Sequence, residues 1–236
     1  MTYKSDSTQS LEVGSKNSFG PALKIASSVY YIKWSDIQQS VYVAGGCGLQ
    51  FTDNLGTAVA KGFDLQAESK LGPMNFDLAV GYTDARYTKA SLLANVGDAI
   101  SGQDAINQSP GATSPWTIAL GAEYGFKLAD HPAFVRMDYQ YQSRNNWYST
   151  FQDPNSLQYN PDTYALPATT FVQLRAGMHL GNWQVSAFAD NLFNSHTVIN
   201  YQLGQLDAFN SVPPHEQENQ YTYRPRTFGL TASLHL

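Results

Sequence analysis

Strict alternation of apolar and polar residues is the feature that most constrains the fold of this chain. The C-terminal end shows it most clearly, with Phe228, Leu230, Ala232, Leu234 and Leu236 on one side of a strand and Gly229, Thr231, Ser233 and His235 on the other. Such a strand suits a wall between lipid and water, and it also suits a soluble sandwich. The other segments must decide between the two.

The same period of two recurs along the whole chain. We find it in nine segments, approximately residues 8–17, 21–43, 57–71, 74–90, 114–127, 132–148, 168–180, 182–194 and 221–236. No window has a convincing helical period, and the 15 tyrosines and 18 glycines favour strands and turns. The sequence therefore predicts an all-β protein of about nine strands.

The connections between these segments alternate in length. Short connections lie near residues 17–21, 72–73, 129–132 and 181–182, and long ones span about 44–56, 91–113, 149–167 and 195–220. An antiparallel up-and-down meander with tight turns at one rim and long loops at the other produces this order. Outer-membrane barrels have that asymmetry, whereas a Greek-key sandwich distributes its long connections over both ends.

Nine strands raise a problem of closure. The first and last strands of such a meander run in the same direction, and bacterial single-chain barrels have even strand numbers. Unpaired strand edges are costly in lipid. Either a tenth strand lies in residues 40–52 or 197–205, or the chain is part of a larger barrel.

Composition excludes several other classes of protein. The net charge is −5 and no block of Lys and Arg occurs, which argues against a nucleic-acid partner. No apolar run reaches the ~18 residues of a membrane-spanning helix. Residues 1–7 lack the charged and apolar regions of a secretory signal. Cys47 is the single cysteine, so no internal disulfide is possible.

The titratable residues form no pattern typical of catalysis. The histidines (His131, His179, His196, His215 and His235) lack metal-ligand spacing, and no nucleophile or phosphate-binding motif occurs. We therefore expect no enzyme activity, metal or cofactor. The carboxylates Asp64, Glu68, Asp77, Glu123, Asp138 and Asp190 fall on the polar sides of their strands, where Lys70, Arg136 and Arg175 are their expected partners.

Several short motifs carry a family resemblance. They are residues 11–16 (LEVGSK), 30–38 (YYIKWSDIQ), 54–64 (NLGTAVAKGFD), 114–116 (SPW), 182–194 (NWQVSAFADNLFN) and 225–229 (PRTFG). In this order and spacing the chain resembles the C-terminal part of a TonB-dependent outer-membrane receptor from about residue 8 to residue 236. The final residue departs from the family pattern, because Leu236 stands where the family usually has Phe.

The resemblance implies both an architecture and a function. Residues 1–236 would be one partial barrel domain, the last nine strands of a 22-stranded barrel, without the plug domain and the N-terminal strands. The location would be the outer membrane of a Gram-negative bacterium. The partners would be outer-membrane lipid, the missing plug and strands, the energy-coupling protein TonB, and a siderophore-, vitamin- or carbohydrate-like nutrient.

The local chemistry of the motifs adds structural expectations. Asn54 and Gly56 suit a loop-to-strand transition that needs positive φ. Gly62 would allow close approach of a neighbour, and the Asn191 amide would bond local backbone. Arg224 and Arg226 could pair with anions in the lumen or the headgroup layer.

The long loops are where ligand recognition is expected. Aromatic residues in one of them could stack on a sugar, a catecholate or a planar macrocycle. These candidates are Trp147, Tyr148, Phe151, Tyr159 and Tyr164. Two other functions stay open at this point, a soluble β-sandwich carbohydrate-binding module and a small self-contained porin-like barrel.

Overall fold

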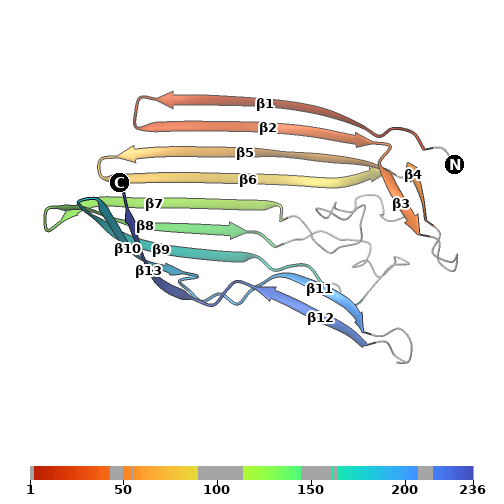
Figure 1. Ribbon diagram of the computed structural model, residues 1–236. Helices are drawn as coiled ribbons and strands as arrows, with labels where there is room; N and C mark the ends of the chain where they lie inside the picture. The colour runs from red at the N-terminus through yellow and green to blue at the C-terminus, as the bar shows by residue number, and fades with distance from the viewer. Residues whose placement is uncertain are drawn as a thin grey trace.

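The fold consists of strands joined by turns and loops. A computed structural model describes residues 3–42, 50–54, 56–89, 114–144, 161, 164–206 and 215–235. Every regular element among them is a strand (Figure 1). No helix among the described residues has the length and apolarity needed to cross a membrane. The prediction of an all-β chain is confirmed.

Nine strands form one antiparallel sheet, in the order β1-β2-β5-β6-β7-β8-β9-β10-β13. Their bounds are β1 (Ser7–Phe19), β2 (Leu23–Ser35), β5 (Thr57–Leu71), β6 (Met74–Lys89), β7 (Trp116–Leu128), β8 (His131–Gln142), β9 (Thr169–Leu180), β10 (Trp183–Asp190) and β13 (Thr227–Leu234). These strands correspond to the nine predicted segments. The predicted meander is therefore confirmed, and the described strands do not form the two packed sheets of a sandwich.

Tight turns gather at one rim of the sheet and long connections at the other (Figure 1). We call these the turn rim and the loop rim. Gly20, Gly72 and Gly181 have φ of +65°, +59° and +61° in three of the tight turns. In the turn between β7 and β8, Ala129 and Asp130 have φ of +47° and +65°, as a type I′ hairpin requires.

Two further hairpins extend the loop rim. One pairs β3 (Gln38–Tyr42) with β4 (Gln50–Asn54), and the other pairs β11 (Val198–Leu206) with β12 (His215–Thr222) (Figure 1). Strands thus occur in the regions 40–52 and 197–205. However, β3 pairs only with β4 and β11 only with β12, and none of the four pairs with the main sheet. The prediction that a tenth strand of the sheet could lie there was wrong.

Two predicted strand boundaries also need correction. The segment 21–43 is interrupted at Asp36, which has φ +54°, and the Asn54 Nδ2 amide donates a 2.7 Å hydrogen bond to the Asp36 carbonyl. The chain therefore leaves the main sheet there and enters β3. The segment 221–236 is divided as well, since residues 221 and 222 end β12 and β13 begins at Thr227.

The cross-strand register sorts the side chains onto two faces, because directly opposed residues of antiparallel strands project to the same side. One row runs Val13, Val29, Phe63, Tyr82 and Trp116 across β1, β2, β5, β6 and β7. We call the side that carries this row the apolar face. Its large side chains are well exposed, including Val13 at 64% and Leu230 at 86%.

The opposite side, the polar face, carries hydrophilic rows in the same register. One of them is Ser18, Lys24, Glu68, Asp77, Gly121, Asp138 and Gln173, running from β1 to β9. A small buried cluster of Ile37, Ala58 and Tyr87, with Trp34 packed against it, lies at the loop rim. The described sheet is therefore a wall with two chemically different faces and little buried core.

The edges of the sheet are β1 and β13. β1 enters a tight turn, and β13 follows a long connection, so both strands run toward the turn rim (Figure 1). They are parallel to each other and cannot pair in an antiparallel ladder. This is the direction predicted from the strand parity.

The turn conformation gives a first prediction. Gly72→Ala should lower the free energy of unfolding by about 1–2 kcal/mol, because an L-residue is strained in the left-handed region. An added Cβ at Gly72 meets no heavy atom within 4 Å, so crowding does not contribute. Urea unfolding followed by tryptophan fluorescence measures the change.

The matched control for this prediction is Gly125→Ala. The φ of Gly125 lies outside the left-handed region, and an added Cβ would meet the Pro73 carbonyl oxygen at 3.6 Å, an ordinary contact. An equal loss of stability in both variants would contradict the assignment of the Gly72 cost to backbone conformation.

Candidate functional site

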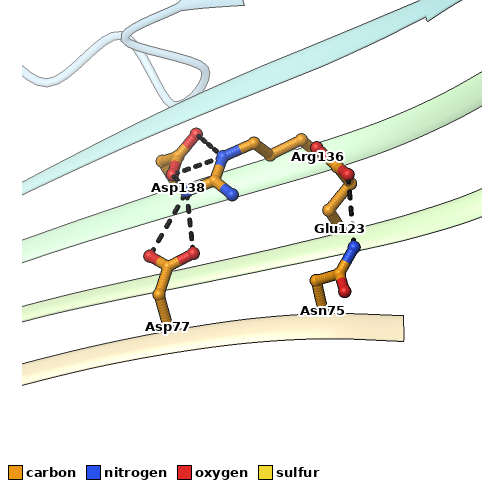
Figure 2. Close-up of polar contacts among 5 residues, drawn as sticks. All are labelled: Asn75, Asp77, Glu123, Arg136 and Asp138. Carbon is orange, nitrogen blue, oxygen red and sulfur yellow. Dashed lines mark hydrogen bonds and ion pairs between the residues drawn. The ribbon is translucent and has the colours of Figure 1, made fainter. Parts of the chain in front are cut away.

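A charged network crosses the polar face over β6, β7 and β8 (Figure 2). Arg136 Nη2 donates to Asp138 Oδ1 at 2.6 Å and to Asp77 Oδ1 at 3.0 Å. Beside this group, Asn75 Nδ2 donates to Glu123 Oε1 at 3.4 Å. One guanidinium thus joins a carboxylate of its own strand to a carboxylate two strands away.

Gly121 of β7 makes this reach possible. It lies between Asp77 and Asp138 in the cross-strand register, directly under the Arg136 side chain. A Cβ added at Gly121 would lie 2.6 Å from Asp77 Cγ and would also collide with Arg136 Nη2. The missing side chain leaves the space in which the ion pair crosses the strand.

Other carboxylates of the polar face also have hydrogen-bonding or ionic partners. Glu68 Oε2 lies 3.6 Å from Lys24 Nζ, and Asp190 Oδ1 accepts a 2.9 Å hydrogen bond from Gln173 Nε2. The expected pairing with Arg136 is confirmed for Asp77 and Asp138, whereas Glu68 and Asp190 have partners other than those expected. Arg175 differs, because its guanidinium lies over the Phe188 ring, 5.9 Å from the centroid.

Asn191 organises the loop rim at the end of β10. It is only 2% exposed and has φ +50°. Its Oδ1 accepts from Ser195 N at 2.7 Å, and its Nδ2 donates to the carbonyls of Ser195 at 3.0 Å and Arg224 at 2.8 Å. The expected backbone bonding of this amide is confirmed, and it ties the end of β10 to the segment that leads into β13.

The remaining motif residues behave in part as expected. Gly56 has φ +111°, whereas Asn54 keeps a negative φ and bonds the backbone of Lys4 and Asp36. A Cβ at Gly62 would lie 2.6 Å from the Tyr30 hydroxyl, so a neighbour does approach closely there. Arg226 packs locally, with Nη1 donating to the Leu192 carbonyl at 3.3 Å and the guanidinium over Phe228.

Of the five predicted ligand-binding aromatics, the structure describes one. Trp147, Tyr148, Phe151 and Tyr159 lie outside the described residues, as does Cys47. The Tyr164 ring stacks on the Tyr201 ring with a centroid distance of 4.3 Å, and the Tyr201 hydroxyl donates to the Tyr164 carbonyl at 3.0 Å. Tyr164 therefore packs against the β11–β12 hairpin, and its role in ligand binding stays a prediction.

The described residues offer no obvious metal centre. No group of three or more His, Cys, Asp or Glu side chains among them is placed to hold an ion. What the described site can do is separate two environments, with exposed apolar side chains on one face and cross-linked charges on the other.

The family model described as TonB dependent receptor-like, beta-barrel, matches residues 3–192. No curated protein sequence matches the chain.

Several solved structures share the fold. One is the ferric yersiniabactin uptake receptor FyuA from Yersinia pestis, with a TM-score of 0.62 and 12% identity over 96% of this chain. Another is the ferripyoverdine receptor of the outer membrane of Pseudomonas aeruginosa, with a TM-score of 0.63 and 15% identity over 96% of this chain. The copper transporter OprC is similar too, with a TM-score of 0.63, 18% identity and 98% coverage. This chain spans 29%, 27% and 31% of these three proteins, respectively.

The close packing over Gly121 gives a second prediction. Gly121→Ala should lower the free energy of unfolding by about 1–3 kcal/mol, because the methyl group displaces the partners of a charge-assisted hydrogen bond. The loss should shrink in an Arg136→Met background, where no guanidinium crosses β7. A double-mutant cycle from urea unfolding measures this coupling. Equal losses in the two backgrounds would show that Gly121 is needed for another reason.

Proposed function

Because this chain belongs to the TonB-dependent receptor β-barrel family, we propose that it forms part of the wall of a nutrient receptor in the outer membrane of a Gram-negative bacterium. The observation that carries the proposal is the separation of apolar and polar rows across the nine strands. Lipid would cover the apolar face, and the water-filled lumen would meet the polar face. The turn rim would then be periplasmic and the loop rim extracellular.

The geometry of the sheet supports a larger barrel. β1 and β13 are edge strands with parallel directions, and lipid offers no hydrogen bonds to an open edge. We infer that residues 1–236 are one partial barrel domain, whose edges pair with further strands of a barrel of about 22 strands. The intact protein would also contain a plug, which the charged network around Arg136 would face across the lumen.

The transported substrate would be a siderophore-, vitamin- or carbohydrate-like nutrient. Two of the similar structures are a ferric yersiniabactin uptake receptor and a ferripyoverdine receptor, and a third is a copper transporter. The aromatic residues Trp147, Tyr148, Phe151, Tyr159 and Tyr164 lie between β8 and β9 in the sequence and would stack on the ligand. TonB would act through the intact receptor, and the barrel wall itself would catalyse no reaction.

Lipid contact on the apolar face gives a third prediction. Leu120→Arg should destabilise the membrane-inserted protein by about 2–4 kcal/mol, the cost of a basic side chain near the bilayer centre. Leu120 lies on the apolar face between Leu78 and Tyr139. Its neighbour Ala119 projects to the polar face, so Ala119→Arg is the matched control and should be tolerated. Unfolding by urea in lipid vesicles measures both, and equal costs would argue against lipid on the apolar face.

The transport role is tested by uptake in the native bacterium. We expect the wild type to accumulate one radiolabelled probe from a panel of ferric siderophores, cobalamin and maltooligosaccharides. A strain lacking the gene for this protein should lose that uptake, and so should a strain lacking TonB. Undiminished uptake of every probe by the deletion strain, under limitation for iron, cobalamin and carbohydrate in turn, would contradict the proposal.

A further inference from the structure

The apolar face changes its chemistry close to the loop rim. Phe63, Tyr82 and Trp116 form an aromatic cluster, with centroid distances of 6.0 Å for Phe63–Tyr82, 5.7 Å for Phe63–Trp116 and 4.7 Å for Tyr82–Trp116. Aromatic rings of this kind mark the boundary between the hydrocarbon layer and the headgroups in membrane barrels. The rows between this cluster and the loop rim carry charged side chains beside the apolar Leu11, Tyr31 and Val59.

Four cations lie in these rows, and we call them the cationic patch: Lys33, Lys61, Arg86 and Lys89. The register places them on the apolar face, since Lys61 opposes Asp84, Val59 opposes both Lys33 and Arg86, and Thr57 opposes Lys89. Asp84 is the one carboxylate among the residues described in these rows of β1, β2, β5 and β6. Four cations against one anion leave three excess positive charges, in a chain whose net charge is −5.

Asp84 forms ion pairs with two of the cations. Arg86 Nε lies 2.7 Å from Asp84 Oδ1, and Lys61 Nζ lies 3.8 Å from Asp84 Oδ2. The Lys61 and Arg86 side chains are 62% and 45% exposed, whereas that of Asp84 is only 19% exposed. Exposed ion pairs of this kind add little stability. The cations therefore present positive charge at the surface, whereas Asp84, which pairs with two of them, is more buried.

The height of the patch fits a headgroup layer. A strand rises about 3.4 Å per residue, so Lys61 lies about 7 Å beyond Phe63 along β5, and Arg86 lies about 14 Å beyond Tyr82 along β6. Strands tilted by about 40° bring these heights down to roughly 5 and 10 Å. The headgroup layer on each side of a bilayer is about 5–8 Å thick, and long basic side chains reach several ångströms further.

We propose that the cationic patch binds the phosphate of an anionic lipid in the leaflet at the loop rim. Charge complementarity selects the phosphate, and the aromatic cluster directly below selects a lipid as its carrier, because acyl chains would lie on Phe63, Tyr82 and Trp116. This inference rests on the proposed location in a membrane. It adds to the transport role a specific lipid site on the outside of the wall.

The test uses the intact receptor extracted from native outer membranes. Native mass spectrometry follows its titration with phosphatidic acid, which carries a phosphomonoester, and with zwitterionic phosphatidylcholine. We expect tight binding of phosphatidic acid to the wild type and weak binding to a Lys33→Gln, Lys61→Gln, Arg86→Gln variant. Each cation near an anionic surface strengthens association roughly fivefold, so the variant should bind on the order of a hundredfold more weakly at low salt.

Two further variants control this test. Lys16→Gln, Lys24→Gln, Lys70→Gln removes the same charge from the polar face and should bind phosphatidic acid like the wild type. Lys33→Arg, Lys61→Arg, Arg86→Lys keeps the charge of the patch and should also retain binding, even where the glutamine variant folds poorly. Unchanged affinity in the glutamine variant, or equal loss in the polar-face variant, would overturn the proposal.

A competition separates a lipid from a soluble phosphate. Glycerol 3-phosphate has the same headgroup chemistry without acyl chains, and it should fail to displace phosphatidic acid at matched concentration. Displacement would assign the patch to a soluble phosphate and overturn the lipid proposal. The uptake assay is a separate readout, so lipid binding without uptake would contradict the transport role and leave the patch supported.

Discussion

The antiparallel ladder is the constraint on which the rest of the structure depends. Side chains alternate along each strand, so a slip of one residue in any strand would move its apolar set to the polar face. Across the nine described strands of the sheet, the register shifts at one place, between Thr57 and Ala58 near the loop rim. The tight turns hold this register, since their positive φ values match the twist of the strands that they join. The two faces therefore follow from turn chemistry and hydrogen bonding together.

This register also explains how the sheet can be stable with so little buried core. Ile37, Ala58 and Tyr87 form a small cluster, while Val13, Leu230 and many similar residues stay exposed on the apolar face. In water such a face would be a severe liability, and in lipid it costs nothing. The polar face is held instead by side chains that cross strands, and the Arg136–Asp77 pair needs an empty position at Gly121 to do so.

The sequence predicted what depends on local periodicity and missed what depends on distant partners. The nine segments and the two unequal rims could be read because alternation, Gly and Pro are local signals. The break at Asp36 could not be predicted, because the alternation of side chains continues through it. The turn there depends on the Asn54 amide, 18 residues away. The stacking of Tyr164 on Tyr201 joins positions 37 residues apart, and the role of Gly121 emerges only once the register aligns Asp77 with Asp138.

The direction of the edge strands limits how this wall can be completed. β1 and β13 both run toward the turn rim, so an even number of added strands would leave two parallel neighbours at the seam. An odd number lets each edge meet an antiparallel partner, and nine strands plus an odd number give the even total of bacterial single-chain barrels. The odd count that is a difficulty for a self-contained barrel is thus what a segment of a larger even-numbered barrel requires. In the proposed barrel, closure would pair both open edges at once, and lipid around the apolar face would meet no unpaired backbone.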